Sequence, residues 1–355
     1  MSEARLSLGT CAFGRAVDAL GAALDGKPPL RGRCVALEQR APPPNERAPV
    51  CVPLWTGVRA IDGLLTFGRG ARIGIFGAPG AGKTTLLEAI ARGCAADAIV
   101  VALVGERGRE AQTWIERCDR RTTIVCATGD RPADERASAA HVAVAHAAAL
   151  RERGLHVLLV LDSLARFAAA ARELSVAKGE SVGRGGYPPS VFAKMAALLE
   201  VAGSFASGSI TLVATVLNDG DERDPVSDAA RSLLDGHVEL AARLAQAGRF
   251  PAVDVAASAS RTMDAVTHGA HAGAARAIRR AIVSLDRASE TRALGLEPSD
   301  ASTRAAIAIE DRLETFLRQE RLEPADWRTT VREALALGAL LQRDERSVLN
   351  SETLR

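Results

Sequence analysis

The sequence predicts an α/β protein with a mostly parallel β-sheet, followed by a helical carboxy-terminal domain. Three observations lead to this prediction. Apolar runs of strand length alternate with helical patterns between Trp55 and Thr267, a glycine-rich turn joins one such strand to a helix within Arg72–Ile90, and the sequence beyond residue 270 is rich in Ala, Arg and Glu at helical spacing. Such alternation is typical of a parallel sheet with helices on both faces, which binds ligands at the carboxyl ends of its strands.

The expected elements follow in chain order. The strands are RIGIFG, AIVVALVG, TTIVCATG, HVLLVLD and SITLVATVL, and covering helices are expected at 138–154 and 188–202. The helices beyond residue 270 are interrupted at EPSD and LEPAD. We therefore expect three segments, which are a short lead-in at 1–54 with the loop-like RAPPPNERAP, the α/β domain at 55–267 and the helical domain at 268–355.

The glycine-rich turn fits the pattern G-x-x-x-x-G-K-[ST] with Gly77, Gly82, Lys83 and Thr84. Glycines let backbone N–H groups curl around an anion, and the helix that follows adds the positive end of its dipole. Lys83 is expected to reach the β- and γ-phosphates, and the Thr84 hydroxyl to bind Mg²⁺. The pattern predicts a nucleotide site that uses Gly77, Ala78, Pro79, Gly80, Ala81, Gly82, Lys83, Thr84 and Thr85.

Two carboxylates end apolar strands. Asp162 ends HVLLVLD and is the expected metal-linked acid, although an Asp after a strand is also a common helix N-cap. Glu106 follows AIVVALVG and is the first candidate for the general base that activates water. Its neighbour Arg107 could bind phosphate or hold Glu106 ionised. The alternative for this run, ERGRE, is a solvated charge cluster in a loop.

The composition argues against several classes of protein. With 45 basic and 43 acidic residues the net charge is +2, which disfavours a strongly basic nucleic-acid surface. No apolar segment approaches the roughly 18 residues of a membrane span, and the start MSEARLSLGT lacks a signal-peptide pattern, so we expect a cytoplasmic protein. The six cysteines have no C-x-x-C spacing and suit buried or free thiols better than zinc or disulfides.

Several longer motifs together resemble the type III secretion ATPases, which are related to the flagellar export ATPase and to the rotary ATP synthase catalytic subunit. These motifs are PLWTGVRAIDGLL, VALVGERGRE, VLDSLARFAAAARELSVAKGE, GYPPSVFAKMAALLEVAG and DPVSDAARSLLDGHVELAARLAQAGRFPAVDVAASASRTM. The resemblance covers roughly residues 12–320 and implies a P-loop core of RecA-like fold that hydrolyses ATP with Mg²⁺. It also implies a role in releasing chaperones and in unfolding and exporting secreted proteins.

The resemblance assigns roles to individual residues. Glu106 aligns with the catalytic carboxylate of the family, and Arg107 with the arginine that contacts the γ-phosphate. Phe250, in GRFPAVD, falls where the family has an aromatic residue that stacks on adenine, and Arg261, in SASRTM, falls on the arginine finger donated to the neighbouring subunit of a ring. For Arg261 the alternative is a structural arginine at a strand end.

Some positions depart from the pattern of the family. Thr84 keeps the hydroxyl of the usual Ser, whereas Ala165 replaces a hydroxyl residue near Asp162, which we expect to weaken a contact around that carboxylate. Asn218–Pro225 differs from a loop that faces the centre of the ring in the family. The β-barrel amino-terminal domain of the family is expected to be largely absent, with only its exit, GRAVDALGAALDGKPPL, within residues 1–54. Weaker self-association should follow.

The expected partners are those of the family: a homo-oligomer, as a hexameric ring, with stator and central stalk proteins, export-gate components and chaperone–effector complexes, in peripheral association with the inner membrane and without nucleic acid. A flagellar export ATPase remains an alternative with the same chemistry. A rotary synthase subunit is disfavoured because that family reads T-R-E-G-N-D where this chain has Arg107–Gln112. An RNA-dependent hexameric NTPase would need a basic or aromatic surface. A non-enzymatic nucleotide-binding scaffold would require Glu106 or Arg261 to be dispensable.

Overall fold

The computed structural model describes residues 5–8, 12–31, 33–37, 39–217, 224–294, 296 and 300–353. The chain divides into two compact units. The sheet unit comprises Met1–Val52, Gly68–Pro79 and Ala96–His237, and the helical unit comprises Pro53–Phe67, Gly80–Ala95 and Val238–Arg355. The predicted division of the chain into domains at 1–54, 55–267 and 268–355 stays a prediction.

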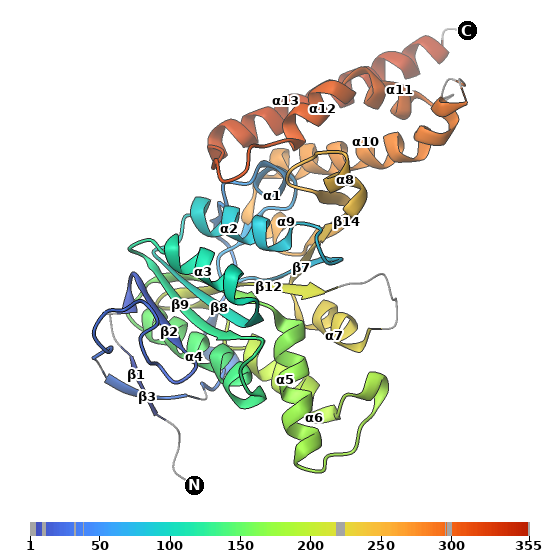
Figure 1. Cartoon of the computed structure of the whole chain (residues 1–355). Helices are drawn as coiled ribbons and strands as arrows, with labels where there is room; N and C mark the ends of the chain where they lie inside the picture. The colour runs from blue at the N-terminus through green and yellow to red at the C-terminus, as the bar shows by residue number, and fades with distance from the viewer. Residues whose placement is uncertain are drawn as a thin grey trace. The chain divides into compact units, whose positions relative to one another are not determined.

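The sheet unit is built on six parallel strands, in the order β7-β12-β10-β8-β9-β2 (Figure 1). Their bounds are β2 Arg15–Asp18, β7 Arg72–Gly77, β8 Ala98–Glu106, β9 Thr122–Thr128, β10 His156–Asp162 and β12 Ser209–Leu217. The five predicted strands are therefore confirmed as β7, β8, β9, β10 and β12. The strand β2 was not predicted, because four residues with only two apolar side chains give a weak signal.

Shorter strands complete this unit. The strand β11 (Gly203–Phe205) pairs antiparallel with both β12 and β4 (Arg47–Ala48), and β1 (Arg5–Leu8) pairs antiparallel with β3 (Arg33–Ala36). One turn of 3₁₀ helix lies at Pro44–Glu46 and another at Arg184–Gly186.

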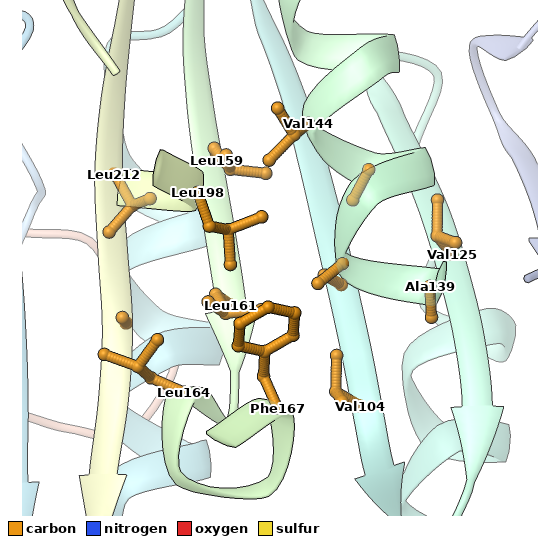
Figure 2. Packing of buried hydrophobic residues seen from close by; sticks show 14 of the residues in the cluster. Val104, Val125, Ala139, Val144, Leu159, Leu161, Leu164, Phe167, Leu198 and Leu212 are labelled. Carbon is orange, nitrogen blue, oxygen red and sulfur yellow. The ribbon is translucent and has the colours of Figure 1, made fainter. Parts of the chain in front are cut away.

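Helices α4 and α5 cover one face of the sheet and form the core with it. The helices of this unit are α3 Gly108–Glu116, α4 Ala133–Arg151, α5 Leu164–Ala177, α6 Pro189–Leu199 and α7 Pro225–Leu233. Figure 2 shows Phe167 and Leu164 of α5 against Leu161 of β10 and Val104 of β8. Alanines of α4 such as Ala139 let that helix approach the strands closely. The predicted covering helices at 138–154 and 188–202 correspond to α4 and α6.

The helical unit contains most of the carboxy-terminal region. Its elements are β5 Pro53–Leu54, α1 Arg59–Leu64, α2 Lys83–Gly93, α8 Ala242–Gln246, β14 Val253–Ser260, α9 Met263–Val266, α10 Gly269–Ala293, α11 Ala301–Ala308, α12 Glu310–Leu317 and α13 Trp327–Thr353. The strands β6 (Phe67–Gly68) and β13 (Gly236–Leu240) lie where the chain passes from one unit to the other. The predicted helical carboxy-terminal region is thus confirmed.

The long helices α10 and α13 pack side by side (Figure 1). A Cβ atom at Gly338 would lie 2.7 Å from the Cβ of Ala274, so only glycine permits this close approach. The predicted break at LEPAD is explained by Asp326, whose carboxylate accepts from the Thr329 N–H at 2.9 Å and caps the start of α13. Of the helices in the described ranges, none is both long and apolar enough to cross a membrane.

Candidate nucleotide and catalytic site

The glycine-rich turn leads from β7 directly into α2. The strand ends at Gly77 and the helix begins at Lys83, as the motif predicts. Gly80 and Gly82 have φ angles of +78° and +94°, and in this left-handed region a side chain would be strained. Leu86 donates its N–H to the Gly82 carbonyl at 2.9 Å, which begins the helical ladder. Thr84 and Thr85 therefore lie in the first turn of α2, close to the positive end of its dipole.

A cavity of about 840 Å³ in the helical unit brings the end of this turn together with Phe250. Gly80, Gly82 and Thr85 line it, and so do Phe250 and Pro251. Phe250 is half-buried and offers an aromatic face beside an apolar wall. A cavity of this size, with backbone N–H groups and an aromatic ring, can hold a purine nucleotide.

Four arginines that the sequence analysis did not single out also line this cavity. They are Arg59, Arg249, Arg318 and Arg321. The Cζ atom of Arg321 lies 5.8 Å from the ring centroid of Phe250, within the range of a cation–π contact. Gln319 holds this wall in place, since its Nε2 donates to the Gly57 carbonyl at 2.7 Å and its Oε1 accepts from the Arg59 N–H at 2.9 Å. Only Arg318 lies in a run that could have indicated it, FLRQ at the end of α12, and the other three lie outside this run.

The carboxylates of Glu106 and Asp162 lie at the ends of neighbouring strands of the sheet unit. Glu106 ends β8 and Asp162 ends β10, and β10 pairs parallel with β8 so that Asp162 lies opposite Leu103. Both side chains are buried, at 7% and 4% exposure, which brings two acids into a largely dry environment. Sequence order alone predicted each residue at a strand end, and the pairing of the strands brings them together.

Asp162 has a buried hydrogen-bond donor on the next strand. The Thr215 Oγ1, on β12, donates to the Asp162 Oδ1 at 2.6 Å. The expectation that the alanine at position 165 weakens a contact around Asp162 stays a prediction. The sequence gives no signal for Thr215, because the pairing of β10 with β12 depends on the fold and not on chain order.

Glu106 pairs with Arg166 at the start of α5. The Arg166 Nε lies 3.1 Å from the Glu106 Oε1, and another nitrogen of the same guanidinium donates to the Gly105 carbonyl. Burial raises the pKa of the Glu106 carboxyl to about 8; the charge of Asp162 adds to this rise and that of Arg166 opposes it. The cation that pairs with Glu106 is therefore Arg166, and the expectation that Arg107 might hold Glu106 ionised was wrong.

Arg107 lies outside this pair. It is exposed and precedes α3, and its Nη1 lies 3.7 Å from the Glu110 Oε1. Such an exposed ion pair contributes little to stability and leaves the guanidinium able to reach a ligand.

Arg261 directly follows β14 in the helical unit, and its side chain is exposed. Within the described part of the chain it has no hydrogen-bond or ion-pair partner. The exposed position fits a residue that acts outside its own subunit. Residues 218–223 of the departing loop at Asn218–Pro225 lie outside the described residues.

Comparison with known proteins identifies the family. The nucleotide-binding domain of the ATP synthase alpha/beta family matches residues 57–260. The type 3 secretion system ATPase of Sinorhizobium fredii is 45% identical over 333 residues, which cover 91% of this chain and 74% of that protein. The flagellum-specific ATP synthase of Salmonella typhimurium is 43% identical over 337 residues, 92% of this chain and 74% of that protein.

A solved structure of a type III secretion ATPase is also similar to this chain. The assembled ATPase EscN in complex with its central stalk EscO, from the type III secretion system of enteropathogenic E. coli, is 37% identical. It superposes with a TM-score of 0.88 over 94% of this chain and 83% of that one. The chain therefore belongs to the ATP synthase alpha/beta family, among the type III secretion and flagellar export ATPases, and is an ATP hydrolase.

Proposed function

We propose that this chain hydrolyses Mg-ATP to energise type III protein secretion, by releasing chaperones and by unfolding and feeding secreted proteins into the export apparatus. The observation that carries the catalytic part is the pair of buried carboxylates, Glu106 and Asp162, at the ends of adjacent strands of a P-loop ATPase. The secretion part is supported by the similarity to a type 3 secretion system ATPase.

The residues fit a nucleotide with its magnesium ion. The Thr84 hydroxyl and the Asp162 carboxylate are oxygen ligands of the kind that Mg²⁺ prefers, and the Thr215 hydrogen bond fixes the orientation of Asp162. When bound, Mg²⁺ would neutralise charge on the β- and γ-phosphates. Lys83 binds the same phosphates, and Phe250 holds the adenine by stacking.

The chemical step is the attack of a water oxygen on the γ-phosphorus. Glu106 accepts a proton from that water as the new P–O bond forms, and the bond between the γ-phosphorus and the β-phosphate oxygen breaks. Arg107 and Arg261 offset the negative charge on the transferring phosphoryl group. Arg166 acts on Glu106 by opposing the rise of its pKa, and so increases the fraction of Glu106 in the carboxylate form that accepts the proton.

Arg261 is proposed to act on the nucleotide of a neighbouring subunit in a homo-oligomeric, hexameric ring. Its exposure after β14 supports this role, as does the similarity to an assembled ATPase. The further partners proposed are a central stalk, stator proteins, export-gate components and chaperone–effector complexes. The proposed location of this chain is the cytoplasm, at the inner membrane. The similarity to EscN bound to its central stalk EscO supports the stalk.

The experiment measures specific ATPase activity against protein concentration for the wild type, Arg261→Ala and the control Arg153→Ala. Arg153 is an exposed arginine after α4 in the sheet unit. Specific activity is expected to rise with concentration in the wild type and the control, and to stay low at all concentrations in Arg261→Ala. Activity that is independent of concentration and insensitive to Arg261 would overturn the shared site and leave a monomeric P-loop ATPase.

The secretion role needs a separate test, because the flagellar relative has similar identity. Lys83→Ala should abolish hydrolysis, since the phosphates lose their lysine. In cells, we expect this variant to reduce secretion through the injectisome while leaving flagellar assembly unchanged. Full secretion by Lys83→Ala would refute the export role, and a defect confined to flagellar assembly would favour the flagellar function.

A further inference from the structure

A second cavity lies in the helical unit and shares no residue with the nucleotide cavity. It has a volume of about 480 Å³, and α10 supplies most of its wall. Arg279, Arg280 and Arg287 surround it, Ser284 lies among them, and Val283 and Leu341 contribute aliphatic surface. No carboxylate is among the described residues that line it.

The arginines of α10 divide into two groups by their partners. Arg276 pairs with Asp264 at 2.9 Å, and Arg292 pairs with Glu310 at 2.8 Å. In contrast, the exposed side chains of Arg280 and Arg287 have no ion-pair partner among the described residues, and both line the cavity. Among the described side chains of α10, the arginines without an ion-pair partner thus lie at this cavity.

Two described acidic residues that neighbour the lining in the chain are already engaged. Asp286 lies 3.6 Å from Arg243, and Asp300 caps α11 by accepting from the Thr303 N–H at 2.8 Å. Asp300 also accepts from the hydroxyl of Ser302, which lines the cavity. Arg279 is held in the wall, since its Nη2 donates to the Ser258 carbonyl at 2.6 Å. Because like charges repel, an anionic ligand between these arginines would offset their mutual repulsion.

The geometry of α10 places Arg280 and Arg287 on one face. Arg280, Ser284 and Arg287 follow at intervals of four and three residues, which is the spacing of neighbours along one side of a helix. They can therefore bind successive acidic groups of one extended ligand. Guanidinium groups suit carboxylates because they donate two parallel hydrogen bonds.

We propose that this cavity binds an acidic peptide segment of a partner protein, with glutamate or aspartate side chains on Arg280 and Arg287 and an aliphatic side chain against Val283 and Leu341. A volume of about 480 Å³ is larger than a single oxyanion fills, and it lies in the range of pockets that bury a drug-sized ligand. Single-stranded nucleic acid is disfavoured, since no aromatic residue is among the described residues of the lining to stack on a base. The inference does not rest on the export role.

Fluorescence anisotropy tests the proposal with a fluorescein-labelled peptide of repeated Glu-Leu-Leu-Glu and the full chain. The reference peptide has Gln in place of Glu. We expect saturable binding of the acidic peptide, at least tenfold weaker binding of the reference peptide, and a loss of affinity with added salt. The double variant Arg280→Gln/Arg287→Gln should bind the acidic peptide at least tenfold more weakly than the wild type.

Matched variants make the result specific. Arg276→Gln removes an arginine of the same helix that is already paired and should bind like the wild type, whereas Ser284→Trp should block the cavity without changing its charge. Circular dichroism checks the fold of each variant. Equal binding by the wild type and the double variant would overturn the proposal, as would equal binding of the two peptides. Displacement of the peptide by a low concentration of inorganic phosphate would instead identify a site for a free anion. It would refute the proposal that the cavity binds a peptide.

Discussion

Replacing Thr215 with valine tests whether the hydrogen bond to Asp162 supports catalysis. Thr215 is fully buried in β12, and its Oγ1 donates to the Asp162 Oδ1 at 2.6 Å. Valine has nearly the same shape, so this change removes one hydrogen bond and keeps the packing of the strand. The Asp162 carboxylate then loses a donor that fixes its orientation, and its charged form becomes less favourable.

The magnitude follows from the type of bond. A hydrogen bond to a charged group contributes about 1.5–3 kcal/mol, and about 1.4 kcal/mol corresponds to a tenfold change. We therefore expect kcat/KM for Mg-ATP to fall by roughly 10- to 100-fold. The Mg²⁺ concentration needed for half-maximal activity should rise as well, because the proposed metal-linked carboxylate is less well held.

The assay is steady-state ATP hydrolysis over a range of Mg²⁺ concentrations, with chemical unfolding of each variant in parallel. Thr123→Val is the control, since Thr123 is a buried strand threonine whose Oγ1 donates to the Ala12 carbonyl at 2.8 Å. This control should lose about 1 kcal/mol of stability and keep its Mg²⁺ dependence. If Thr215→Val remained within about twofold of the wild type in kcat/KM, the proposed link between Thr215, Asp162 and the metal would be wrong.

Three further predictions concern binding, pH and packing. Phe250→Ala should raise KM for ATP about tenfold by removing an aromatic stacking contact, with Phe250→Tyr close to the wild type; a KM unchanged in both would remove Phe250 from the adenine site. Burial lowers the pKa of His146 from 6.5 to about 4, so its contribution to stability is complete above pH 6.5 and is lost as the pH falls toward 4. Urea unfolding should therefore show about 2 kcal/mol less stability from this group near pH 5 than at neutral pH, and His146→Leu should lose that dependence. Gly93→Ala would bring a Cβ within 2.5 Å of the Thr56 carbonyl oxygen and should destabilise the fold by about 1–3 kcal/mol, whereas Gly273→Ala meets no atom within 4 Å; thermal unfolding that ranks them the other way would contradict this packing argument.

The sequence predicted the central strands well because their physical signal is local. β8 and β10 are buried along their whole length, so they appear in the sequence as uninterrupted apolar runs. β14 was missed because its alanines and serines after Val255 form no strong apolar alternation. β13 was missed as well, at Gly236–Leu240.

The site was predicted in part, for a related reason. The motif alone identified the glycine-rich turn, since its glycines, lysine and threonine are consecutive in the chain. The resemblance to a known family, and not the local pattern, indicated Phe250 and Arg261. Contacts between distant positions gave no such signal, and Arg166 and Thr215 were therefore not predicted.

By itself, the sequence determined the class of fold, the phosphate-binding turn and the positions of Glu106 and Asp162 at the ends of apolar strands. Only the tertiary structure decided which groups surround them. The order of strands in a parallel sheet differs from their order in the chain, and it is this order that places β10 between β8 and β12. Asp162 thereby meets Thr215, and the turn into α5 brings Arg166 to Glu106. The arginines of α10 that have no ion-pair partner among the described residues were likewise visible only once the folded chain showed which carboxylates pair with the others.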